Sequence, residues 1–163
     1  MNAISKLNPQ KIQIVEFRIV RGHVECPFEF QTTAIEAYQS EADFDMAFNQ
    51  EKKLVKADLK INIATMSQGQ VFSEAKSDFH IAFLYFVENM EELLEVGADM
   101  KANVDAGLAN AIASITYSTS RGILMTRLQG TALKDFILPV IPPNSLLKEG
   151  IIPPPANLKL PKQ

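Results

Sequence analysis

Residues 103–130 read N-V-D-A-G-L-A-N-A-I-A-S-I-T-Y-S-T-S-R-G-I-L-M-T-R-L-Q-G, and they predict one long helix. Asn103 is a favourable N-cap residue, and Asp105 places a negative charge in the first turn, where it meets the helix dipole. Gly130 stands where helices commonly end on a glycine. At 1.5 Å per residue such a helix is roughly 40 Å long.

The helix is unusually poor in charge. Its only charged residues are Asp105, Arg121 and Arg127, too few to coat an exposed half-cylinder, so we expect it to be covered on more than one side. A sheet covers one side, and a second copy of the chain could cover the other. The expected seam consists of Leu108, Ile112, Ile115, Thr119, Gly122 and Thr126. Alternatively, the many small residues serve only helix propensity and close packing on the sheet.

The residues before the helix alternate between apolar and polar side chains, as strands do. In residues 11–21 the apolar positions change parity, which predicts a strand with a bulge. The alternation is clearest in 43–49 and returns in 59–63 and 71–87. Short polar turns between these strands favour an antiparallel sheet. We therefore expect an α+β fold, with a four-stranded antiparallel sheet, a short helix within 89–96 and the long helix.

Two features remain open at this point: the conformation of residues 28–34 and the cover of the last strand. Residues 28–34 fit either a strand or an extended crossover. In the last strand both sets of alternating side chains are apolar, so both of its faces need cover. We expect the interface between copies to comprise Ile115, Thr119, Gly122, Leu84 and Phe86.

Length and composition exclude several classes of protein. The 163 residues, 47% of them apolar, suit one domain with a core that needs no disulfide or metal. A net charge of −3 argues against a nucleic-acid partner. The longest apolar run, residues 81–87, is far shorter than the roughly 18 residues of a membrane span. No export signal is visible in residues 1–9, and Cys26 stands alone, so we expect a cytoplasmic protein without membrane insertion.

Catalytic and metal-binding patterns are missing from the sequence. His23 and His80 have no partner at metal-ligand spacing, and the seven glycines form no phosphate-binding motif. No catalytic signature surrounds the neighbours His23 and Cys26. The acidic run 88–95 fits the solvated face of a short helix. We therefore expect a protein that is not an enzyme and that uses no cofactor and no metal.

The order of elements and the end of the long helix carry a family resemblance. A bulged strand, a polar crossover, three meandering strands and a short helix precede the long one, which ends in R-L-Q-G-T-A-L-K-D-F-I-L-P-V-I-P-P (127–143). In this order and in this helix-Gly-Thr ending, the chain resembles the SecB family of export chaperones. The resemblance covers residues 11–147, the expected chaperone domain, flanked by a flexible N-terminus (1–10) and a Pro-rich extended tail (148–163).

The resemblance implies a sheet packed by a short and a long C-terminal helix, assembled as a dimer of dimers. Such proteins are ATP-independent holdases, which bind unfolded preproteins in hydrophobic grooves and pass them to SecA. The family's grooves are lined by the crossover, the helix connection and the long helix. Carried over to this sequence, the groove residues are Phe28, Phe30, Tyr38, Val104, Leu108 and Ile112. Ordinary core packing is the alternative for each of them.

The sequence departs from the family in its C-terminal tail, and this departure suggests a second possible function. Its export members typically carry a tail with cysteine and histidine ligands for a zinc ion that docks on SecA. This sequence has no cysteine after Cys26 and no histidine after His80. A SecB-like chaperone dedicated to another client, such as the antitoxin of a toxin-antitoxin pair, is therefore the alternative to export.

Two further functions lie outside the family. A hot-dog thioesterase would have a similar composition, but its long helix comes early and between strands. It would also need a positioned carboxylate, for which Asp105 is the only weak candidate. An oligomeric adaptor with one fixed, folded partner is the other possibility.

Overall fold

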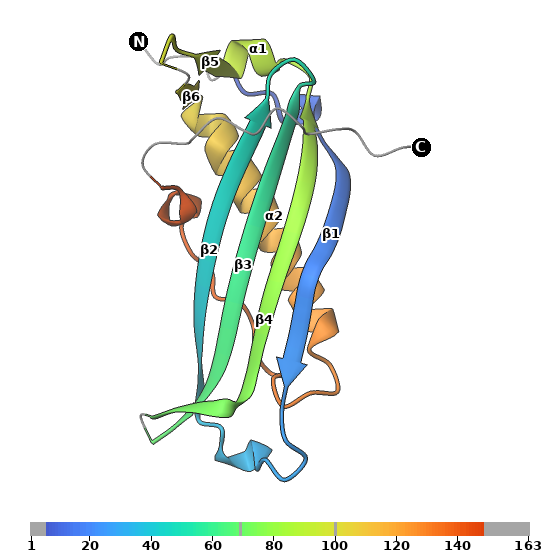
Figure 1. Ribbon diagram of the computed structural model, residues 1–163, viewed down its shortest axis with the longest axis vertical. Helices are drawn as coiled ribbons and strands as arrows, with labels where there is room; N and C mark the ends of the chain where they lie inside the picture. The colour runs from blue at the N-terminus through green and yellow to red at the C-terminus, as the bar shows by residue number, and fades with distance from the viewer. Residues whose placement is uncertain (1–5, 69, 100, 149–163) are drawn as a thin grey trace.

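Four long strands form one antiparallel sheet in the computed structural model, which describes residues 6–68, 70–99 and 101–148. The sheet has the order β1-β4-β3-β2, and helix α2 crosses one face of it diagonally (Figure 1). The strands and the helix are β1 (Ile12–Glu25), β2 (Ala37–Asn49), β3 (Leu54–Ser67), β4 (Gln70–Val87) and α2 (Ala106–Arg127). This architecture confirms the expected α+β fold with its four-stranded antiparallel sheet.

Smaller elements connect the strands and follow the long helix. Helix α1 (Met90–Leu93) leads into the hairpin of β5 (Leu94–Val96) and β6 (Ala102–Val104), and three short 3-10 helices complete the fold. These are η1 (Pro9–Lys11), η2 (Thr32–Ala34) and η3 (Pro143–Leu146). Most of the expected flexible N-terminus and Pro-rich tail lies outside the described residues.

The first strand contains two bulges where the sequence predicted one. Its register against β4 shifts around Val15 and again around Val20, and the strand continues to Glu25. The residues that follow form turns and η2 instead of another strand, so the crossover reading of 28–34 is correct. This crossover is needed because β1 and β2 lie at opposite edges of the sheet.

Both ends of the long helix differ in detail from the sequence prediction. Asn103 is not the N-cap, because it pairs with Glu95 in the β5–β6 hairpin. Asp105 is the cap instead, and its carboxylate accepts a hydrogen bond from the Leu108 backbone N–H at 3.1 Å. The helix ends at Arg127, and Gly130 has a φ of +78°, a backbone conformation that favours glycine.

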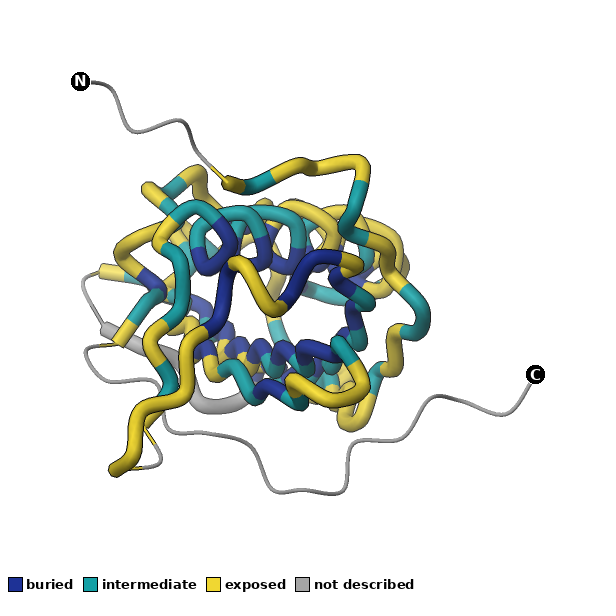
Figure 2. Tube along the Cα trace, turned by 90° about the horizontal axis from the view of Figure 1, so that it is seen from above, coloured by how far each residue is buried: buried dark blue, intermediate teal, exposed yellow. Residues whose placement is uncertain are grey.

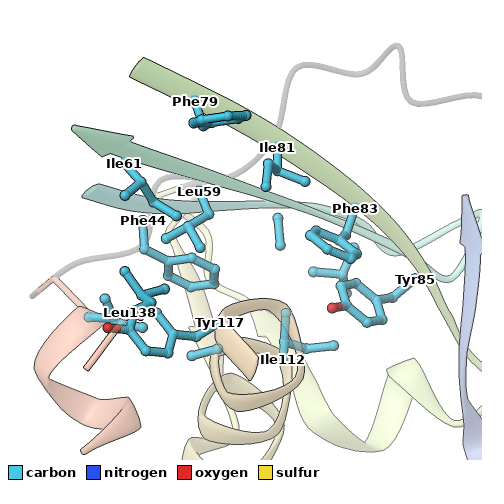
Figure 3. Close-up of a cluster of buried hydrophobic side chains, with 14 of the residues drawn as sticks. Phe44, Leu59, Ile61, Phe79, Ile81, Phe83, Tyr85, Ile112, Tyr117 and Leu138 are labelled. Atoms are coloured by element: carbon cyan, nitrogen blue, oxygen red, sulfur yellow. The ribbon is translucent and has the colours of Figure 1, made fainter. Parts of the chain in front are cut away.

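The core lies between the sheet and α2. We call the sheet face toward α2 the inner face and the opposite one the outer face; buried residues gather between the two layers (Figure 2). Fully burying a large aliphatic or aromatic side chain contributes about 1.5–3 kcal/mol, so this layer dominates stability. Buried inner-face residues drawn in Figure 3 are Phe44, Leu59, Ile61, Phe79, Ile81, Phe83 and Tyr85, which meet Ile112 and Tyr117 of α2.

One buried hydrogen bond joins the two layers. The Tyr85 hydroxyl lies 2.8 Å from Thr116 Oγ1, and both residues are buried. Burial raises the pKa of Tyr85 to about 12, which keeps the phenol neutral. The pair thereby satisfies two polar groups inside an otherwise apolar layer.

After α2 the chain turns back along the helix, and we call residues 129–147 the return segment. The Tyr117 hydroxyl donates to the Pro139 carbonyl at 2.9 Å, and Arg121 Nε donates to the Leu138 carbonyl at 2.8 Å. Leu133, Phe136 and Leu138 of this segment are buried. The chain therefore covers one flank of α2 by itself, which reduces the helix surface left for a second copy.

Candidate functional site

The six expected groove residues do not lie together. Phe28, Phe30 and Tyr38 belong to the crossover end of the sheet, whereas Val104 lies in β6 at the other end (Figure 1). Strand β2, with 13 residues, runs between these ends and is about 40 Å long. Val104 is half-buried and packs against the core, so it does not share a groove with the crossover.

Leu108 and Ile112 are core residues. Each has a relative exposure of 0%, and each belongs to the buried cluster between α2 and the sheet. A groove residue needs a side chain that a client can reach, which neither of them offers. The expected groove must therefore be reduced to its crossover members, because the apolar stripe of α2 is used for packing on the sheet.

A cavity of about 210 Å³ lies where the crossover meets the return segment, and we call it the crossover cavity. Tyr38 lines it and packs edge-on against Phe136, with ring centroids 5.6 Å apart. Burial, with the nearby Asp135 carboxylate, raises the pKa of Tyr38. The lining residues are Thr32, Thr33, Ile35, Tyr38, Thr131, Ala132, Lys134 and Asp135.

The crossover also presents an aromatic ring to solvent. Phe28 is 100% exposed, while Phe30 is half-buried and its backbone N–H donates to the Pro27 carbonyl at 3.0 Å. A wholly exposed phenylalanine on a turn contributes no packing to the fold. Covering such a ring with a partner would contribute free energy that the chain alone does not use.

The return segment adds apolar surface that the sequence analysis did not assign to the site. Ile137 is 59% exposed and Val140 is 87% exposed, although Leu138 between them is buried. The signal in the sequence is the apolar, proline-containing stretch F-I-L-P-V-I-P-P (136–143) after Gly130.

The expected oligomer residues lie on two separate surfaces. Thr119 and Gly122 are exposed on α2, and a Cβ at Gly122 would meet no atom within 4 Å. Ile115 is half-buried on the same helix. Leu84 and Phe86 are half-buried on the outer face, because their odd-numbered neighbours in β4 occupy the inner face. One contact with one partner cannot cover both surfaces.

Charged side chains elsewhere form pairs. His80 Nε2 lies 2.7 Å from Asp58 Oδ1, and Lys56 Nζ lies 2.8 Å from Asp58 Oδ2. Among the described residues, no group of three or more His, Cys, Asp and Glu side chains could hold a metal ion. Asp105, the carboxylate considered for a thioesterase, serves as the cap of α2. No helix in this part of the chain is long and apolar enough to cross a membrane.

Comparison by sequence gives no relative: no family model and no curated protein matches the chain. Among solved structures, it is similar to the SecB-like chaperone Rv1957 of Mycobacterium tuberculosis, which was solved in complex with a ChAD peptide from the Rv1956 HigA1 antitoxin. That match has a TM-score of 0.52 and 16% identity, and covers 81% of this chain and 91% of that one.

A second similar structure is a protein of unknown function from Streptococcus agalactiae. It matches with a TM-score of 0.29 and 10% identity, over 79% of this chain and 97% of that one, which is too low a score to indicate a common fold. The first likeness agrees with the strand order and the long helix described above. From these observations, the chain has the fold of the SecB-like chaperones.

Proposed function

We propose that this protein is a chaperone that holds an unfolded, apolar segment of one dedicated partner, of which an antitoxin is the best-supported class. The observation that carries the proposal is the crossover end, where the fully exposed Phe28 stands on the same segment that forms the crossover cavity. Support for the partner class comes from the similar Mycobacterium tuberculosis chaperone, which was solved with an antitoxin peptide.

The proposed mechanism needs binding energy and no chemical step. An unfolded segment offers apolar side chains and free backbone groups, which a folded protein hides. Phe28 provides an apolar contact, the exposed Ile137 and Val140 of the return segment add apolar surface, and the threonines of the crossover cavity provide hydrogen-bonding groups. Neither a nucleotide nor a cofactor takes part.

The proposal includes an oligomer. A second copy covers the exposed side of α2 at Ile115, Thr119 and Gly122, where the helix carries few charges and has open space. Two or more crossover ends on one assembly would let a client bind the second site intramolecularly, so that weak sites together hold tightly. Light scattering of the full-length protein tests this part, and a monomer at micromolar concentration would contradict it.

Export is the competing function, and one experiment separates it from a dedicated partner. Full-length protein is titrated, without ATP, against overlapping fluorescent peptides from candidate antitoxins and against a chemically unfolded model protein, with anisotropy and light scattering as readouts. We expect saturable binding of one apolar peptide, at least about ten-fold tighter than that of the unrelated unfolded chain.

Each other outcome has a definite meaning. Equal affinity for all unfolded polypeptides, with aggregation suppressed at a several-fold excess, would replace the dedicated partner with a general holdase, as export requires. No binding of any peptide and unchanged aggregation would overturn the chaperone proposal itself. Tight binding of a folded partner alone would favour the adaptor.

A further inference from the structure

The outer face of the sheet carries an apolar patch that no described helix covers (Figure 1). We call it the outer patch; it consists of the half-buried Ala82, Leu84 and Phe86 of β4. Around it lie the charged side chains Glu16, Arg18 and Lys56, which line a shallow cavity together with Ala82 and Leu84. The patch is thus an apolar area within a charged surface, on the side opposite to α2.

The described chain arrives at this face at its last residue. Lys148 Nζ lies 2.6 Å from Asp43 Oδ1 and 3.4 Å from Asp45 Oδ1. These two aspartates point to the outer face, because Phe44 between them is buried against the inner face. The last described residue is therefore tied to the β2 edge through side chains of the outer face.

The sheet register fixes how far the patch lies from that point. Asp45 pairs with Asp58, and Asp58 pairs with Ala82, so these three residues form one row across the sheet. Two strand spacings, or about 10 Å, separate the first residue of the row from the last. An extended chain spans at most about 3.5 Å per residue, so the segment 149–163 is long enough to cross the sheet from the β2 edge to the patch.

The sequence beyond Lys148 has the chemistry to cover this patch. It reads E-G-I-I-P-P-P-A-N-L-K-L-P-K-Q (149–163), in which two isoleucines precede three prolines. The isoleucines supply apolar surface for the patch. Prolines have no backbone N–H, so a segment crossing a sheet face without strand pairing loses fewer hydrogen bonds there.

We propose that residues 149–163 bind the outer face of their own subunit, with Ile151 and Ile152 on Leu84 and Phe86. Lys148 acts as the anchor at the β2 edge, and the segment that follows shields the outer patch from other apolar surfaces. This proposal stands apart from the proposed function, since the patch and the crossover cavity have no lining residue in common.

Disulfide trapping in the full-length chain tests the proposal. In a Cys26→Ser background, Ala82→Cys and Ile152→Cys form the test pair, and Gln129→Cys with Ile152→Cys forms the matched control at an exposed position beyond the end of α2. Oxidation in glutathione buffers gives the effective concentration of each pair. We expect that of the test pair to be at least about ten-fold higher.

An effective concentration of the test pair that is equal to or lower than that of the control pair would overturn the proposal. Disulfide-linked dimers as the main product would also overturn it, because they would place a second copy on the patch. Lys56→Cys replaces Ala82→Cys if the latter variant fails to fold. Adding Ile151→Asp to the test pair should lower its effective concentration about ten-fold. An unchanged value would mean that apolar contact does not hold the segment there.

Discussion

The inner face of the sheet and the crossover end use the same residue type in opposite ways. Phe83 on the inner face is 1% exposed and stacks on Tyr85, with ring centroids 6.1 Å apart. Phe28 on the crossover is 100% exposed. The first ring supports the fold, while the second is free to contact a partner. Composition alone, with ten phenylalanines in the chain, does not separate these two uses.

The contrast predicts that damage to the two regions has different consequences. A substitution on the inner face should change the free energy of unfolding, because α2 and the sheet close over it. A substitution at the crossover end should change the binding of a partner and leave stability nearly unchanged. The first two experiments below test this separation, and two smaller ones test the cap of α2 and the ion pair at the β2 edge.

The largest effect is expected for Ile112→Ala, in the closed layer. The change removes buried methyl and methylene groups and leaves a cavity, so the free energy of unfolding should fall by about 2–5 kcal/mol. Urea denaturation followed by circular dichroism measures it. Glu51→Ala, an exposed position in the turn between β2 and β3, is the control and should stay within about 0.5 kcal/mol. If Ile112→Ala instead lost peptide binding at unchanged stability, Ile112 would be a client-binding residue.

The double variant Phe28→Asp, Phe30→Asp tests the crossover end. Charges there should weaken binding of the apolar peptide at least about ten-fold, because the peptide would then cover carboxylates in place of rings. Anisotropy measures the affinity, and light scattering checks that the oligomer is unchanged. Val96→Asp, a 47% exposed position in β5 at the other end of the sheet, is the matched control. Loss of assembly in the double variant would show that the two rings are structural.

A smaller effect is expected at the start of α2. Asp105→Ala removes the acceptor for the Leu108 backbone N–H, and this should cost about 1 kcal/mol of stability. Asn103→Ala should cost clearly less, since Asn103 is exposed in the hairpin and does not cap the helix. Equal losses in urea denaturation would contradict the assignment of the cap.

The smallest effect concerns the anchor at the β2 edge. Hydrogen bonding to Lys148 lowers the pKa of Asp43 from its ordinary value of 3.8. The pair therefore stabilises the fold above that ordinary value, and this contribution disappears as the pH falls through the lowered pKa. In Lys148→Ala, an NMR titration of the Asp43 carboxyl carbon should show the pKa moving back up. An unchanged pKa would show that the ion pair does not form in solution.

Periodicity made most of the fold predictable. The strands, the order of elements and the long helix follow from patterns that lie within a few residues of one another, and the structure confirms them. The predicted ends of the helices were wrong where the same residues belong to the β5–β6 hairpin. Asn103 is a good cap by residue type, yet it pairs with Glu95, and helix α1 ends after Leu93 because the following residues form that same hairpin.

The candidate site was less predictable, since it joins segments far apart in the sequence. Tyr38 was expected to line a groove and does line the crossover cavity, but its neighbour Phe136 comes from the return segment nearly a hundred residues later. Nothing in the local pattern pairs the crossover with that segment. The separation of Leu84 from Ile115 onto two surfaces likewise depends on which face of the sheet meets α2.

The sequence by itself determined the alternation of the strands, the charge-poor helix and the SecB-like order of elements, because side-chain period and capping act over short distances. The tertiary structure alone decided which apolar residues are buried and which remain exposed to solvent. It buries Ile112, leaves Phe28 in solvent and brings the return segment to the crossover, because burial depends on which distant surfaces meet.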